Sequence, residues 1–207
     1  LKERPELTQK TLALYYGFGL LFRQNPQLWP ELARIASAQK SDGARFSAAF
    51  VVRMLGPEGE ARLRPLLSPE AVAALEKTAG VPVAVAEVGN STDLDRLWME
   101  FFASGQVGPV RRLVGELVRF RDALAPAEFK AKKEKGETTP ADLAKVMNFL
   151  VGAAAKWSLG SNARQHPVVR FYLEAMLKRG EIKDPHSAAL IEEILRKAAE
   201  PAAGPRK

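Results

Sequence analysis

The chain has 207 residues, of which 46% are hydrophobic and 27% are charged, and its formal net charge at pH 7 is +7. This length allows one substantial hydrophobic core, or two small cores that share an interface, and the balance of apolar and charged residues is typical of a folded protein rather than a disordered one. The chain contains no cysteine, which excludes disulfide bonds, thiolate metal sites and cysteine nucleophiles.

The basic charge does not by itself indicate nucleic-acid binding. Most Lys and Arg residues alternate with Asp and Glu along the chain, a pattern typical of solvated helix surfaces. The longest apolar segment, residues 12–22, is shorter than the roughly 20 residues that cross a membrane, so we expect a soluble chain without a transmembrane segment. The first residue is Leu1 rather than Met, which fits a removed export signal, a removed longer leader or a trimmed chain.

Apolar residues recur at spacings of three and four along most of the chain, which predicts an all-α fold. A first helix is expected from about Pro5 to Arg23 and a second over residues 27–38. The expected apolar face of the first helix contains Leu7, Leu14, Phe18, Leu21 and Phe22. Ser41 and Ser68 are expected to cap the next helices at their N-termini.

The middle of the chain contains the one candidate strand, Val81–Val88. It has no partner strand, so we interpret it as an extended connector packed on helices. Thr92 then opens a helix through Ser104 that contains Trp98, Phe101 and Phe102. We interpret these aromatic residues as core residues, and the alternative is an aromatic groove for a peptide or ligand.

Residues 129–138 form the most polar run in the chain and predict a mobile loop. Three helices are expected after it, with approximate bounds Thr139–Leu159, Pro167–Arg179 and Pro185–Ala198. The tail, residues 201–207, is expected to be disordered.

Apolar helices followed by a turn and a second helix recur around Asn25-Pro26, Gly56, Gly105 and Gly180. The turns are unevenly spaced, so the pattern is no regular repeat array. We predict a single helical domain over residues 1–200, with about nine or ten helices in an irregular stack of αα-hairpins. Such a compact bundle would resemble tetratricopeptide (TPR) or HEAT repeats.

The densest cluster of hydrogen-bonding side chains lies in a predicted polar turn over residues 157–166. The candidate ligand-binding or partner-binding residues in it are Trp157, Ser158, Asn162, Arg164 and His166. Arg164 suits a carboxylate or phosphate, and Asn162 and His166 can supply directional hydrogen bonds. The alternative interpretation is structural, with Asn162 as a helix cap and Arg164 and His166 connecting two helices.

Patterns of catalytic or metal-binding residues are missing from the chain. The only two histidines, His166 and His186, precede or follow prolines and have no metal-ligand spacing. A phosphate-binding loop, a dinucleotide-binding glycine pattern and a nucleophile elbow are also missing. We therefore expect no metal, no cofactor and no enzymatic activity.

Two segments, LWxxFFAxG over residues 97–105 and AKWSLxSNARQHP over residues 155–167, resemble a family of uncharacterised bacterial all-helical proteins. The resemblance extends from about Phe18 to Tyr172. It implies a helical fold and, because many members begin with an export signal, an exported or periplasmic protein. It implies no activity and assigns no functional residue.

These observations together predict a non-catalytic helical module that binds a protein partner or serves as a scaffold, because stacked helix pairs offer grooves. One alternative is a small-ligand-binding protein that uses residues 157–166. A second alternative is weak electrostatic binding of nucleic acid through Lys130–Lys135, which would make affinity strongly dependent on salt.

Overall fold

The computed structural model describes residues 9–78 and 85–200. Every regular element within them is helical, with α-helices α1 to α11 and three short 3-10 helices, η1 to η3, so the predicted all-α fold is confirmed. The chain divides into two compact units, Leu1–Glu87 with Asp95–Gln106 and Val88–Leu94 with Val107–Lys207. The single domain over residues 1–200 and the TPR/HEAT-like stack stay predictions, and the predicted tail, residues 201–207, lies outside the described residues.

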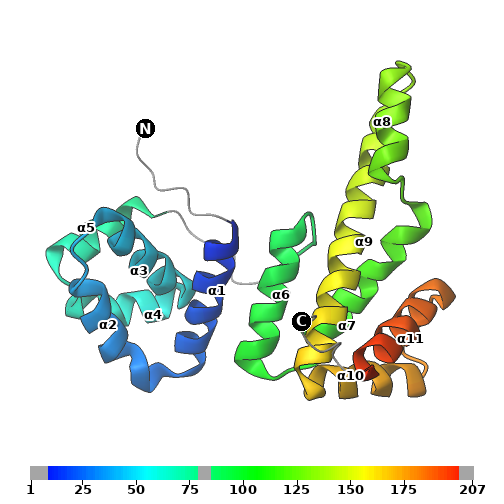
Figure 1. Ribbon diagram of the computed structural model, residues 1–207. Helices are drawn as coiled ribbons and strands as arrows, with labels where there is room; N and C mark the ends of the chain where they lie inside the picture. Colours follow the sequence, from blue (N-terminus) through cyan, green and yellow to red (C-terminus); the bar gives the residue numbers. More distant parts are fainter. Residues whose placement is uncertain (1–8, 79–84, 201–207) are drawn as a thin grey trace, which may run out of the picture. The chain divides into compact units, whose positions relative to one another are not determined.

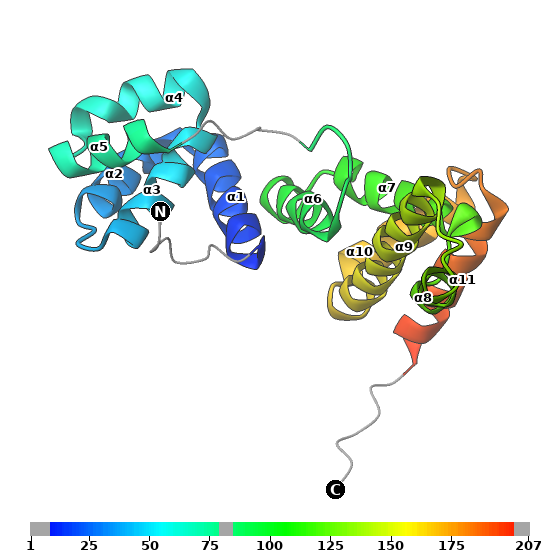
Figure 2. The ribbon, with the colours of Figure 1, turned by 90° about the horizontal axis from the view of Figure 1, so that it is seen from above.

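The N-terminal unit is built around α3. Its elements are α1 (Gln9–Gln24), η1 (Pro26–Leu28), α2 (Trp29–Ser37), α3 (Asp42–Met54), α4 (Gly56–Leu63), η2 (Arg64–Leu66), α5 (Pro69–Lys77) and most of α6 (Ser91–Ser104). Helix α3 contacts α1, α2, α4 and α5 and lies between α1 and α2 (Figure 1 and Figure 2). Its buried residues Val52 and Leu55 pack with Leu32, Leu63 and Leu75 in one core.

The two predicted helix caps Ser41 and Ser68 are confirmed. The Ser41 and Ser68 side chains accept hydrogen bonds from the backbone N–H groups of Ala44 and Ala71, each at 3.3 Å. Gly105 ends α6 with a φ of 69°, a conformation that favours glycine. The predicted cap of α6 was displaced by two residues, since Asn90 Oδ1, not Thr92, accepts from the first N–H groups of this helix.

The predicted apolar face of α1 was wrong in part, since Phe22 packs against the core of this unit while three other predicted members do not, and Leu7 lies outside the described residues. Leu14, Phe18 and Leu21 are exposed, whereas Tyr16 and Leu20 are buried. Apolar side chains surround this helix on several sides, so their spacing alone does not select the face that packs. The residues that pack are those beside Gly19, where the absence of a side chain lets Met54 approach.

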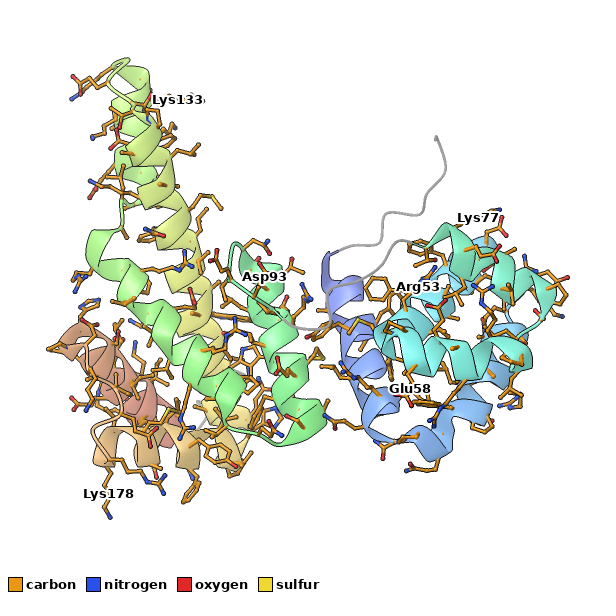
Figure 3. The ribbon with its side chains drawn as sticks, turned by 180° about the vertical axis from the view of Figure 1, so that it is seen from behind. Arg53, Glu58, Lys77, Asp93, Lys133 and Lys178 are labelled. Carbon is orange, nitrogen blue, oxygen red and sulfur yellow. The ribbon has the colours of Figure 1, made fainter. Side chains whose placement is uncertain are left out.

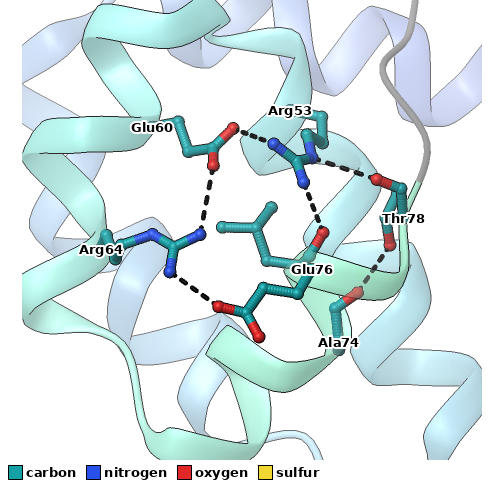
Figure 4. A network of polar contacts seen from close by, with 7 residues as sticks. Arg53, Glu60, Arg64, Ala74, Glu76 and Thr78 are labelled. Carbon is teal, nitrogen blue, oxygen red and sulfur yellow. Dashed lines mark hydrogen bonds and ion pairs between the residues drawn. The ribbon is translucent and has the colours of Figure 1, made fainter.

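Arg53 connects three helices of the N-terminal unit (Figure 4). Its guanidinium donates to Glu60 Oε2 at 2.5 Å, to the Leu75 carbonyl at 2.8 Å and to the Thr78 carbonyl at 3.2 Å. The two carbonyls lie at the C-terminal end of α5, where backbone C=O groups have no N–H partner within the helix. Arg64 continues the network, with nitrogens 3.6 Å from Glu60 and 3.0 Å from Glu76. The network ties the end of α5 to α3 and α4.

The segment between α5 and α6 is described only in part. Val81–Ala84 lie outside the described residues. Val85–Val88 are neither helix nor strand, and both Val85 and Val88 are buried. The burial of Val85 and Val88 agrees with a packed segment, and its extended conformation on helices stays a prediction.

The C-terminal unit is built around α9. Its elements are α7 (Gly108–Gly115), η3 (Glu116–Asp122), α8 (Pro126–Glu134), α9 (Pro140–Gln165), α10 (Pro167–Lys178) and α11 (Pro185–Ala199). Helix α9 contacts all the others, and α8 lies beside its N-terminal half as a projecting hairpin (Figure 1). Close packing of η3 depends on Gly152, where a Cβ atom would lie 3.2 Å from the Phe120 ring.

Two predicted boundaries in this unit were wrong. Residues 129–134 belong to α8 rather than to a loop, and only residues 135–139 are non-helical. The mobility predicted for residues 129–138 stays a prediction. Helix α9 continues past Leu159 to Gln165, because no proline interrupts it before Pro167 and its polar side chains bond within the helix. None of the helices in the described segments is long and apolar enough to cross a membrane.

Candidate functional site

A shallow, open cavity of about 480 Å³ lies on the C-terminal unit between η3, α9 and α11. Aromatic and aliphatic groups form one part of its lining, and charged or polar groups form the other. The lining residues are Phe120, Phe149, Ala153, Lys156, Trp157, Gly160, Ser161, Arg164, Gln165, Glu193, Ile194 and Lys197. We call this feature the α9 cavity.

Trp157 is the most exposed large apolar side chain at this cavity, with 74% of its surface accessible. Arg164 lies seven residues later, two turns along the same helix face, and it also lines the cavity. The Arg164 side chain is exposed and makes no hydrogen bond or ion pair with the part of the chain that the structure describes. An indole face and a guanidinium without a partner in the described chain thus line the same cavity.

Glu193 fixes the two lysines at the cavity. Its carboxylate accepts hydrogen bonds from Lys156 Nζ at 2.7 Å and from Lys197 Nζ at 2.6 Å. These hydrogen bonds, with the positive charge of both lysines, lower the pKa of Glu193 from 4.5 to about 2. The carboxylate is therefore ionised at neutral pH, and three cations face one anion around the cavity.

The five residues predicted from the sequence divide between two faces of α9. Trp157 and Arg164 line the cavity, while Ser158, Asn162 and His166 do not. Ser158 is buried and donates to the Ala155 carbonyl at 3.1 Å, and Asn162 donates to the Ser158 carbonyl at 2.9 Å. The predicted polar turn over residues 157–166 is helical up to Gln165, so its side chains diverge by about 100° per residue.

His166 and Asn162 have local roles at the end of α9. The His166 backbone N–H donates to the Asn162 carbonyl at 2.8 Å, which places His166 at the C-cap. Asn162 bonds within α9 rather than capping it, and the predicted connection of two helices through Arg164 is not found among the described residues, whereas the ligand role of Asn162 and His166 stays a prediction. The binding role of Trp157 and Arg164 stays a prediction.

Sequence reasoning missed the α11 and η3 residues of the cavity. Glu193 and Lys197 are spaced as an i, i+4 ion pair, but nothing in the sequence indicates that α11 lies against Lys156. The aromatic floor, Phe120 and Phe149, has ring centroids 5.7 Å apart in an edge-on arrangement. This contact depends on the close packing of η3 on α9.

A row of residues extends from the cavity along α9, in which Leu143, Met147, Leu150 and Trp157 are exposed and Ala154 and Ser161 are half-buried. Its members follow one another at spacings of four and three residues, and we call them the α9 stripe: Leu143, Met147, Leu150, Ala154, Trp157 and Ser161. The exposed fractions of Leu143, Met147 and Leu150 are 55%, 40% and 47%. The stripe lies opposite the buried face of α9, which contains Gly152, Ala155 and Leu159.

The aromatic segment of α6 is mostly core, as the sequence predicts. Trp98 and Phe101 are buried, and their rings meet edge-on with centroids 6.0 Å apart. The expectation was wrong for Phe102, which is exposed and stacks on Trp98 at 5.9 Å. Trp98 Nε1 and Glu100 Oε2 are buried without a hydrogen-bond partner among the described residues.

The lysine-rich segment predicted as a nucleic-acid alternative is partly neutralised by acids. Lys132 Nζ lies 2.8 Å from Asp142 Oδ1, and Lys130 Nζ lies 3.9 Å from Glu134. Hydrogen bonds from Lys132 and Thr139 lower the pKa of Asp142 from 3.8 to about 2. Lys132 thus helps to hold α8 against α9, while the Lys130 pair lies within α8, and this geometry does not favour a phosphate-binding stripe.

The charged side chains that line the α9 cavity are paired with one another, except for Arg164. Ser161, the hydroxyl residue of the lining, accepts a hydrogen bond from Gln165 Nε2 at 2.9 Å. Over residues 9–78 and 85–200, no three His, Asp or Glu side chains are placed to hold a metal ion.

Comparison of this chain with models of protein families, with curated proteins and with solved structures finds no match. The resemblance of residues 97–105 and 155–167 to a bacterial helical family therefore stays a prediction, and the function is argued from the residues themselves.

Proposed function

We propose that this chain is a non-catalytic helical module that binds another protein through a surface centred on Trp157. The observation that carries this proposal is the 74% exposure of the Trp157 side chain on a long, packed helix. An exposed tryptophan leaves a large apolar area in water, and burying it against a partner recovers that free energy.

The surroundings of Trp157 support a protein ligand. Tryptophan and arginine are enriched among the residues that dominate protein–protein affinity, and here Trp157 and Arg164 lie on one face of one helix. Helix α9 is held by η3, α10 and α11, so the helix backbone that carries the two side chains is already ordered before they are engaged.

Affinity capture with the full chain tests this proposal. The bait is the wild-type chain, the Trp157→Ala variant or the Phe171→Ala variant, the last as a control because Phe171 is 61% exposed on α10 and does not line the cavity. The proposal predicts that a protein captured from native extract by the wild type and by the control is lost with Trp157→Ala. Equal capture by all three baits would contradict it.

A second candidate function is binding of a small anionic ligand in the α9 cavity. It is favoured by the free Arg164 guanidinium beside an aromatic lining, which suits an aromatic carboxylate or phosphate. Titration with benzoate and phenyl phosphate, followed by calorimetry, tests it. Saturable binding that Arg164→Gln abolishes would favour this candidate, and the absence of binding to both probes would exclude it.

We also propose that the chain is an exported bacterial protein. The support is the likeness of its two segments, 97–105 and 155–167, to a family of which many members carry export signals. Fractionation of native cells with an antibody against the chain tests this, and recovery with cytoplasmic markers would contradict it.

A further inference from the structure

The α9 stripe has the geometry of a helix-docking seam. Successive members are separated by four, three, four, three and four residues, the alternation that keeps a row of side chains facing a second helix. From Leu143 to Ser161 the row extends about 27 Å at 1.5 Å per residue. It is one residue wide, which is the width of a coiled-coil seam and narrower than the apolar face that packs on a globular core.

The charges around the stripe are positive. Helix α9 contains one acidic residue, Asp142, and that carboxylate is bound by Lys132 and Thr139. At the Trp157 end, Lys156, Arg164 and Lys197 surround the single anion Glu193. At the other end, Lys133 lies at the tip of the α8 hairpin (Figure 3), whereas Lys130 and Lys132 are paired with Glu134 and Asp142.

This charge pattern disfavours a second copy of the chain as the occupant. In a parallel pair of α9 helices the Arg164 ends would meet each other. In an antiparallel pair each Arg164 end would meet the Lys133 end of the partner's α8. Both arrangements bring like charges together, which weakens association.

A membrane surface is also a poor match for the stripe. Helices that lie in a lipid interface bury a broad apolar face, whereas the flanks of the stripe are a buried packing face and charged or small residues. The narrow stripe instead has the width that the a and d positions of one partner helix would cover.

We propose that the α9 stripe binds an amphipathic helix of a partner protein whose apolar residues are flanked by Asp and Glu. The apolar side of that helix covers Leu143, Met147, Leu150 and Trp157, and its acidic flank pairs with Arg164. This inference rests on the proposed function, because it specifies the class of partner that the Trp157 surface recognises.

Fluorescence anisotropy with two labelled helical peptides tests the inference. Both peptides carry leucine at the a and d positions of three heptads, and they differ only in glutamate or lysine at the flanking positions. The full chain is titrated into each peptide as the wild type, as Leu150→Glu, as Arg164→Glu and as Leu66→Glu. Leu66 is 56% exposed on the N-terminal unit and is the matched control.

We expect the acidic peptide to bind at least about tenfold more tightly than the basic peptide. Leu150→Glu and Arg164→Glu should each weaken the acidic peptide by about tenfold or more, and Leu66→Glu should not. Circular dichroism of each variant confirms that the helices remain folded.

Four results would overturn the inference: no binding of the acidic peptide, equal binding of the two peptides, binding of anionic vesicles that Leu150→Glu abolishes, or a dimer in sedimentation that Leu150→Glu dissociates. If the peptides show no charge preference while Trp157→Ala still abolishes capture from extract, the inference fails and the proposed function stands. Capture that is unaffected by Trp157→Ala contradicts the proposed function itself.

Discussion

The carboxylate of Glu193 on α11 accepts a hydrogen bond from Lys156 Nζ on α9 at 2.7 Å. Together with Lys197 on the next turn of α11, this pair holds α11 against α9 at the edge of the cavity. Because Glu193 engages both lysines, Arg164 is the cation at this cavity that has no partner within the described chain. A partner carboxylate would therefore meet Arg164 first.

The Glu193 pair predicts a specific dependence of stability on pH. The pKa of Glu193 is lowered from 4.5 to about 2 by its hydrogen bonds to Lys156 and Lys197, so the unfolded chain binds this proton more readily than the folded chain. The contribution to stability is complete above pH 4.5 and is lost as pH falls toward 2. We expect Glu193→Gln to lower the free energy of unfolding at pH 7, with a difference from wild type that shrinks below pH 4.5.

The neighbouring acid provides a matched control for this measurement. Glu192 is exposed and makes no ion pair in the described part of the chain. Urea unfolding of Glu192→Gln should therefore follow the wild type at every pH. A Glu193→Gln variant whose deficit stays constant from pH 7 to pH 3 would contradict the role of this carboxylate.

Among the arginines of the N-terminal unit, we expect the half-buried Arg53 to contribute most to the free energy of unfolding. Arg53→Met removes one ion pair and two hydrogen bonds to the end of α5, and we expect a loss of about 2 to 3 kcal/mol in the free energy of unfolding. Arg62→Met is the control, since its pair with Glu58 is exposed and should contribute less than about 1 kcal/mol. Equal losses in urea unfolding would show that the network contributes no more than a surface pair.

Gly19 should not tolerate alanine although it lies inside a helix. A Cβ atom at this position would overlap the Cβ atom of buried Met54. Overpacking of this kind costs about 1 to 3 kcal/mol, which exceeds the gain in helix propensity of up to about 1 kcal/mol. Thermal unfolding should show a lower Tm for Gly19→Ala, whereas Gly115→Ala should match or exceed the wild type, since no described atom lies within 4 Å of its Cβ position.

Thr139 begins α9 through a reciprocal capping box. Its side chain accepts from the Asp142 N–H at 3.2 Å, and Asp142 accepts from the Thr139 N–H at 2.9 Å. Thr139→Ala should lower the free energy of unfolding by about 1 kcal/mol. Thr138→Ala is the matched control, because the Thr138 side chain is exposed and makes no hydrogen bond with the described residues. A comparable loss in Thr138→Ala would contradict the capping role.

Helix boundaries could be predicted where a single residue decides them. Ser41, Ser68, Thr139 and Asp184 each bond a backbone N–H three residues later, and this contact depends on local sequence alone. The end of α9 could not be predicted in this way. Its polar residues Asn162 and Gln165 bond to groups four residues earlier, so they continue the helix rather than end it.

The candidate site could be located but not assembled from the sequence. Trp157 and Arg164 were predicted within a turn, and their shared face appears only when the segment is helical. The contribution of Glu193 depends on the packing of α11 on α9, which no short-range pattern encodes. The exposed face of α1 was mispredicted for a related reason, since packing partners far along the chain select the face that is buried.

A photo-crosslinking residue at position 157 tests the central claim most directly. The chain with benzoylphenylalanine in place of Trp157 is expressed in native cells and irradiated, beside a chain with the same residue in place of Leu66, which is exposed on the N-terminal unit. The proposed function predicts a discrete crosslinked protein species for position 157 and none for position 66. The same crosslinking pattern at both positions, or no protein adduct at position 157, would contradict the assignment of the Trp157 surface as a protein-binding site.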